Sequence, residues 1–126
     1  MQTVLLIGAG GMVGAVLRYG AVTAVQRLAG PGFPWGTLLV NVVGSLILGA
    51  LLVVTDRMAS GEAVRRFAAV GVLGAFTTFS AFSAEVVTML RDGVWLRAGT
   101  YAAVSVGLAV GALAAGVAMT THLLRD

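Results

Sequence analysis

The chain has 126 residues, of which 59% are hydrophobic and only 10% are charged, and its mean hydropathy is +1.00. This composition excludes an ordinary water-soluble domain and indicates an integral membrane protein. All eight basic residues are scattered arginines, which argues against nucleic-acid binding, and the absence of cysteine excludes disulfides and thiolate metal sites.

Four apolar stretches are long enough to cross the hydrocarbon core of a bilayer. They are Val4–Val25, Trp35–Thr55, Phe67–Leu90 and Ala98–Leu123. The connections between them are short, so we expect one all-α transmembrane domain of four helices over residues 1–126. The first stretch has no basic start and no small-residue cleavage pattern, which favours a permanent span over a removable signal peptide.

The first span introduces two features of the sequence, an arginine and paired small residues. Arg18, near the far end of the span, either snorkels to the headgroups or places a fixed positive charge at a pore mouth. Small residues four positions apart let helix backbones approach closely, and we expect packing contacts at most of them. The pairs are Gly10/Gly14, Gly71/Ala75 and Gly107/Gly111.

The second span places an amide in the middle of the membrane. Asn41 lies between Val40 and Val42, although polar groups inside a span are costly. Its amide offers two N–H donors and a carbonyl acceptor, which suits coordination of an anion. The alternative is an interhelical hydrogen bond that stabilises the bundle. The sequence leaves both interpretations open.

The third span contains glycines, hydroxyls and aromatic rings where a simple anchor would have Leu, Ile and Val. Such groups are tolerated at bilayer depth mainly where they face protein or a wet cavity, so the span indicates an ion path. Phe76, Phe79 and Phe82 recur every three residues and predict a stripe along one helical side, whose positive ring edges can face an anion. Hydroxyl donors alternate with the rings, at Thr77, Thr78, Ser80 and Ser83.

The same span predicts a broken helix. Gly71 and Gly74 weaken a helix, and Thr77 and Thr78 compete for its backbone hydrogen bonds. At a two-fold axis, carbonyls freed by the break in two copies would form an oxygen cage for a hard cation, without any carboxylate.

Few other polar residues lie within the spans. Glu85 pairs with an arginine or faces a wet vestibule, and we favour the ion pair. Tyr101 and Ser105 are four residues apart, so they share a helical face and either line a pathway or are ordinary interfacial hydroxyls. His122 is a single histidine near the last helix end, which favours an interfacial residue over a metal ligand.

The arginines are almost evenly divided between the two sides of a four-span protein. One side carries Arg57, Arg65, Arg66 and Arg125, and the other carries Arg27, Arg91 and Arg97, with Arg18 near it. Because an excess of basic residues in short loops sets orientation, this balance predicts insertion in both orientations. The natural assembly is then an antiparallel homodimer with a two-fold axis.

Three segments resemble the signatures of the CrcB/Fluc-type bacterial fluoride channels, in order and over essentially the whole chain. They are Gly10–Tyr19 (GGMVGAVLRY), Gly36–Ser45 (GTLLVNVVGS) and Gly71–Phe82 (GVLGAFTTFSAF). The resemblance implies a dual-topology dimer with two antiparallel fluoride pores and a structural sodium ion on the two-fold axis.

The resemblance also implies roles for individual residues. The carbonyls of Gly74 and Thr77 would hold the sodium, Phe79 and Phe82 would be the pore rings, Asn41 the pore amide, and Tyr101 and Ser105 the start of a hydroxyl track. Ala109 is apolar where some members of the family continue that track with a hydroxyl. Thr78, Ser80 and Arg18 complete the predicted fluoride path.

The function that the resemblance implies is passive, electrodiffusive export of fluoride across the bacterial inner membrane. No Ser/His/Asp or paired-carboxylate arrangement supports an enzyme. The alternative is a four-span, dual-topology, proton-coupled exporter of the small multidrug type. Such a carrier needs a membrane-embedded carboxylate, for which Glu85 is the candidate.

Overall fold

The computed structural model describes residues 1–59 and 61–125 of the chain; Ser60 and Asp126, which belong to the predicted domain 1–126, lie outside the described residues. The described part is built from helices joined by short turns. They are α1 (Gln2–Ala29), α2 (Trp35–Asp56), α3 (Gly61–Val64), the π-helix η1 (Arg65–Leu73), α4 (Gly74–Phe76), α5 (Phe79–Arg91) and α6 (Trp95–Leu123). The all-α prediction is confirmed.

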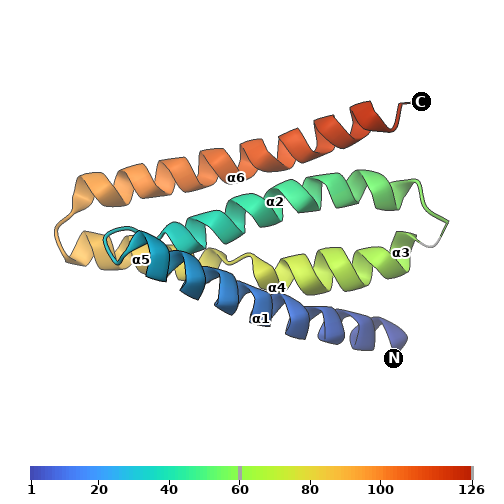
Figure 1. Ribbon diagram of the computed structural model, residues 1–126, viewed down its shortest axis with the longest axis horizontal. Helices are drawn as coiled ribbons and strands as arrows, with labels where there is room; N and C mark the ends of the chain where they lie inside the picture. The colour runs from blue at the N-terminus through green and yellow to red at the C-terminus, as the bar shows by residue number, and fades with distance from the viewer. Residues whose placement is uncertain (60, 126) are drawn as a thin grey trace.

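Four spans cross the length of the molecule, as predicted. Three are the single helices α1, α2 and α6, and the third in chain order is the composite segment Gly61–Arg91. The spans exceed their predicted bounds at most ends, because α1 and α6 continue beyond their most apolar residues. Figure 1 shows the spans side by side, with both termini at the end that also holds the α2–α3 connection.

Glycines bring neighbouring spans into backbone contact. A Cβ atom added to Gly49 of α2 would lie 2.2 Å from the carbonyl oxygen of Leu113, and one added to Gly116 of α6 would lie 2.2 Å from that of Leu46. Only a residue without a side chain permits such an approach. The α2–α6 crossing is therefore fixed by glycine on both helices.

The predicted small-residue pairs have different outcomes. Gly10 and Gly14 of α1 pack on η1, because an added Cβ would lie 2.2 Å from the Phe67 oxygen or 2.1 Å from the Val72 oxygen. A Cβ at Gly107 or Gly111 would meet no atom of the described chain within 4 Å. The packing prediction is thus confirmed for the first pair and wrong for the last pair within this chain.

The third span is broken near its middle, as the glycines and threonines predicted. Helix α4 ends where Thr77 turns extended (φ −84°, ψ 158°), and Thr78 is also extended (φ −151°, ψ 117°) before α5 begins. Figure 1 shows the break between α4 and α5. The predicted continuous stripe of phenylalanines is wrong, because the break separates Phe76 from Phe79 and Phe82.

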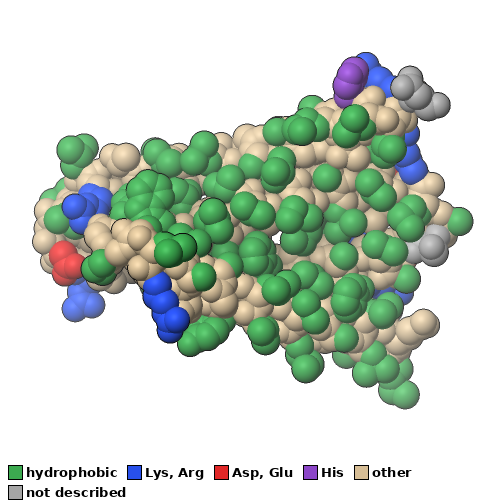
Figure 2. Space-filling view, viewed as in Figure 1, with side chains coloured by type: hydrophobic (Ala, Val, Ile, Leu, Met, Phe, Trp, Pro, Cys, Tyr) green, Lys and Arg blue, Asp and Glu red, His purple; other side chains and the backbone are tan. Residues whose placement is uncertain are grey.

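The surface matches a molecule surrounded by lipid. Hydrophobic side chains cover the visible face along its length, and charged side chains lie toward the two ends (Figure 2). Both tryptophans, Trp35 and Trp95, are exposed at the start of α2 and α6, where aromatic residues mark a membrane–water interface.

Candidate ion pathway

Asn41 joins the second span to the break in the third. Its Oδ1 accepts a hydrogen bond from the backbone N–H of Thr78 (2.7 Å), and its Nδ2 donates to the carbonyl of the same residue (3.0 Å). The two bonds satisfy the backbone N–H and C=O of Thr78, an extended residue that lies between two helices. The interhelical interpretation of Asn41 is therefore correct, and one of its two Nδ2 hydrogens remains for another acceptor.

Thr78 also begins α5. Its side-chain oxygen accepts from the N–H of Ala81 at 3.1 Å, the geometry of a helix N-cap, and lies 3.2 Å from the hydroxyl of Ser80. The residue is buried. Thr78 thus fixes the break by two sets of hydrogen bonds. Its backbone bonds Asn41 of α2, and its side chain caps α5.

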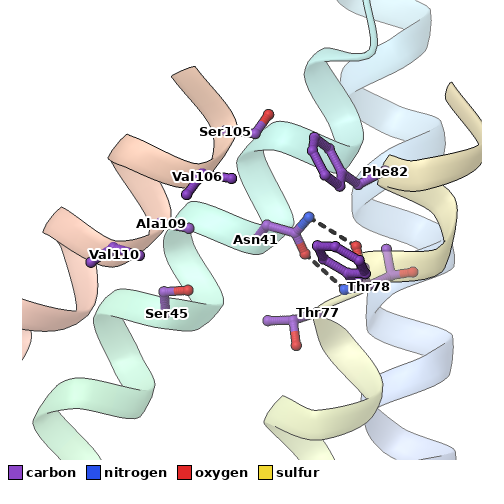
Figure 3. A pocket seen from close by; sticks show the side chains of 10 residues that line it. Asn41, Ser45, Thr77, Thr78, Phe82, Ser105, Val106, Ala109 and Val110 are labelled. Atoms are coloured by element: carbon purple, nitrogen blue, oxygen red, sulfur yellow. Dashed lines mark hydrogen bonds between the residues drawn. The ribbon is translucent and has the colours of Figure 1, made fainter. Parts of the chain in front are cut away.

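A cavity of about 310 Å³ lies beside the break, between α2, α5 and α6. Its polar lining comes from both sides of the break and from two other helices: Asn41, Ser45, Thr77, Thr78 and Ser105. The remaining lining is apolar, from Phe79, Phe82, Val106, Ala109 and Val110. Figure 3 shows the Asn41 amide bonded to Thr78 in the centre of this cavity.

The two phenylalanine rings that follow the break differ in burial. Phe82 is 8% exposed and packs on Tyr101, with ring centroids 5.3 Å apart. Phe79 is 75% exposed, and its ring centroid lies 5.4 Å from that of Phe82. Both line the cavity, so one ring is anchored in the protein and the other stands at its open side.

The cavity holds a hydroxyl that has no internal partner. Ser105 is 6% exposed, and its Oγ, buried from solvent, makes no hydrogen bond within the described residues. A buried polar group without a partner is costly. Since Ser105 lines the cavity, its hydroxyl is a buried polar group of this lining that has no partner within the described residues.

Two other predicted donors are already occupied. The hydroxyl of Thr77 donates to the carbonyl of Leu73 at 3.0 Å, and that of Ser83 donates to the carbonyl of Phe79 at 2.8 Å. The prediction that these hydroxyl hydrogens lie free along the pathway is wrong. Threonine and serine within a helix commonly bond the carbonyl one turn back.

Tyr101 lies behind the cavity. It is fully buried, and its hydroxyl donates to Glu85 at 2.6 Å, while the hydroxyl of Thr37 donates to the other oxygen of Glu85 at 2.6 Å. Glu85 forms no salt bridge within residues 1–59 and 61–125. The predicted ion pair with an arginine is therefore wrong, because two hydroxyls take its place.

A second cavity, of about 590 Å³, contains the remaining predicted residues. Arg18 and Ser80 line it together with Glu85, Thr37 and Thr78. Thr78 also lines the first cavity, so it contributes to the lining of both spaces. The predicted path residues are thus divided between the two cavities, except for Tyr101, which is in the lining of neither.

The break leaves two backbone carbonyls without their helical partners. In a continuous helix the Gly74 carbonyl would accept from the N–H of Thr78, and the Thr77 carbonyl from that of Ala81. These amides instead donate to Asn41 and to the Thr78 hydroxyl. Gly74 is also exposed. Both oxygens fit the ligand preference of a hard cation such as sodium.

The sequence interpretation missed Thr37 and Ser45. Both belong to α2, four residues before and four residues after Asn41, so the three polar side chains share one helical face. This spacing is a signal that could have identified them. The two residues were not singled out because a lone threonine or serine is common in an apolar helix.

Comparison with known proteins gives two consistent findings. The family model described as CrcB-like protein, Camphor Resistance (CrcB), matches residues 5–117. A curated protein named Fluoride-specific ion channel FluC from Hyphomonas neptunium is 51% identical over 98% of each chain. Proteins of the same name from Rhizobium meliloti, 44% identical over 94% of this chain and 96% of its own, and Caulobacter vibrioides, 45% identical over 93% and 94%, are similar.

Proposed function

This chain belongs to the CrcB-like protein family, and from that premise we propose that it is a fluoride-specific ion channel of the bacterial inner membrane. The relatives that carry this name cover nearly the whole chain. They give no support to the small multidrug-type exporter.

The observation that carries the proposal is the composition of the cavity at the break. Free donors from Asn41 and Ser105 face two phenylalanine rings, and the described residues that line the cavity include no basic side chain. Neutral donors and positive ring edges can replace the water of a small hydrated anion. A basic group would bind the anion too strongly for conduction. Fluoride would therefore pass down its electrochemical gradient without any catalysed chemistry.

The assembly that completes this pathway is an antiparallel homodimer. Its support is the outward face of α5, where Phe79 is 75% exposed and Ser80 is also exposed. Together with the exposed Gly74, this face presents polar groups near the bilayer centre, where contact with lipid is unfavourable even though the Ser80 hydroxyl already bonds Thr78. A second copy across a two-fold axis would cover this face and close the open side of each cavity.

The same axis would carry a structural sodium ion. The carbonyls of Gly74 and Thr77 from each copy are the proposed ligands, and sodium would supply positive charge that neutralises these converging dipoles. We expect the dimer to lose thermal stability when sodium is replaced by N-methylglucamine, and to regain it when sodium is restored. Equal stability in both solutions would contradict the sodium site.

The channel is tested by fluoride efflux from liposomes that contain only the purified chain. An imposed potential should drive rapid fluoride efflux, while chloride stays inside. Protein-free liposomes are the control. Absence of fluoride efflux from correctly folded protein, or equal efflux of chloride, would overturn the proposed function.

A further inference from the structure

The polar groups of the cavity divide into those whose hydrogens are occupied and those whose hydrogens are free. Thr77 donates to Leu73, and the Thr78 hydroxyl accepts from Ala81 and shares a hydrogen bond with Ser80 in which either hydroxyl can be the donor. One hydrogen of the Asn41 amide bonds Thr78. The lining hydrogens that take part in no hydrogen bond within the described residues are the second one of Asn41, that of Ser105 and that of Ser45.

These three donors form a row along the cavity. Ser45 is four residues after Asn41 on α2, which places it one turn away on the same face, roughly 6 Å along the helix. Figure 3 shows Ser105 and Ser45 on opposite sides of Asn41, with Ser45 near Ala109 and Val110 of α6. Ser45 is half-buried, so its hydroxyl is reachable from the cavity.

The α6 wall explains why Ser45 matters. Beyond Ser105 this wall consists of Val106, Ala109 and Val110, which have no polar side-chain atom. On the Ser45 side of Asn41, the Thr77 hydroxyl is the only other side-chain hydroxyl in the lining, and its hydrogen is taken by Leu73. An anion leaving Asn41 in this direction would therefore meet apolar surface if Ser45 lacked its hydroxyl.

From this arrangement we propose that Ser45 is a specificity-determining residue of the pathway, whose hydroxyl donates a hydrogen bond to the permeating anion one helical turn beyond Asn41. The proposal rests on the proposed fluoride channel function. A short hydroxyl donor suits a small anion with high charge density, because each lost water is replaced by one donor at close range. Ser45 thereby supplies from α2 the donor that α6 lacks at Ala109.

The test is fluoride efflux from liposomes by the wild type, Ser45→Ala, and the double variant Ser45→Ala/Ala109→Ser. Ser45→Ala removes a hydroxyl that bonds nothing in the chain, so we expect unchanged thermal stability and about tenfold slower fluoride efflux, equivalent to about 1.4 kcal/mol in the barrier. The double variant returns a hydroxyl to the same stretch from the opposite wall and should recover most of the rate. Thr121→Ala, which removes a hydroxyl near the C-terminal end of α6 and outside the cavity, is the matched control.

Each outcome has a distinct meaning. Fluoride efflux by Ser45→Ala within twofold of wild type would overturn the role of Ser45 while leaving the channel function intact. Slow efflux that is not recovered by Ala109→Ser, or that comes with lower thermal stability, would assign the hydroxyl a structural role and also overturn it. A wild type that transports no fluoride would overturn the channel function together with the inference built on it.

Discussion

At the scale of single residues, the paired hydrogen bonds between Asn41 and Thr78 connect structure to conduction. Asn41→Ala removes both bonds and leaves the buried N–H of Thr78 without an acceptor, so we expect a loss of about 1–3 kcal/mol in unfolding free energy and fluoride efflux reduced more than tenfold. Thermal unfolding in detergent and liposome efflux measure the two effects. Val43→Ala, an exposed position on the same helix, is the control.

A second variant separates the structural role of Asn41 from its role as a neutral hydrogen-bond donor. Asn41→Asp can still accept from the Thr78 amide, but it presents a negative group to the Thr78 carbonyl and to any anion. We expect folded protein with little or no fluoride efflux. Wild-type efflux by Asn41→Asp would show that the anion does not approach this side chain.

Tyr101 allows the hydrogen bond to Glu85 to be tested separately from ring packing. Tyr101→Phe keeps the ring that packs on Phe82 and Phe33 and removes only the hydroxyl. Leaving one partner of a buried hydrogen bond unsatisfied costs about 1–3 kcal/mol, so we expect that loss in unfolding free energy. Tyr19→Phe, at an exposed tyrosine, should change stability by less than about 0.5 kcal/mol. Equal effects at both tyrosines would contradict the importance of the Glu85 contact.

At the scale of helices, α1 is held against η1 by glycine contact. Gly10→Ala would place a Cβ 2.2 Å from the Phe67 oxygen, whereas Gly11→Ala would meet nothing within 4 Å. We expect Gly10→Ala to destabilise the protein by about 1–3 kcal/mol, because the two backbones must separate. Gly11→Ala should be neutral or mildly stabilising, since alanine favours helix. Thermal unfolding of the two neighbouring variants gives the comparison, and similar melting temperatures would refute the contact.

How much of these elements the sequence predicts depends on the range of the interaction. Hydropathy identifies four spans, and the local sequence of Gly71, Gly74, Thr77 and Thr78 predicts the break, because both depend on neighbouring residues. The paired hydrogen bonds between Asn41 and Thr78 join residues that are 37 positions apart in the sequence, and no local pattern specifies them. The π-helical form of η1 was likewise not predicted, because a local pattern of apolar residues does not distinguish its hydrogen-bond register from that of an α-helix.

The individual site residues follow the same rule. Asn41, Phe82 and Ser105 were predicted because polar or aromatic residues in a span are conspicuous, and the structure places all three at one cavity. The ion pair predicted for Glu85 was wrong because its hydroxyl partners come from other helices. Ser45 went unnoticed because its importance depends on the apolar α6 wall opposite it.

At the scale of the whole molecule, the balance of arginines between the two ends predicts dual topology. Both termini lie at the end that carries Arg57, Arg65 and Arg66 (Figure 1). We expect a reporter fused to the C-terminus to be active on both sides of the membrane, because neither end has a clear excess of basic residues. Adding three lysines at the C-terminus should retain that end in the cytoplasm. Reporter activity on one side only, in the unmodified chain, would contradict dual topology.

The glycine contact between α2 and α6 has a mechanical consequence. Gly49 and Gly116 lie next to the stretch in which Asn41 and Ser45 on one helix face Ser105 and Ala109 on the other. Because backbones already in contact cannot approach further, and because separating them would open a void, the gap between these walls has a nearly fixed width. An anion that needs more room than these walls leave would have to separate the two helices. The channel would then discriminate between halides by the stiffness of its frame as well as by the chemistry of its lining.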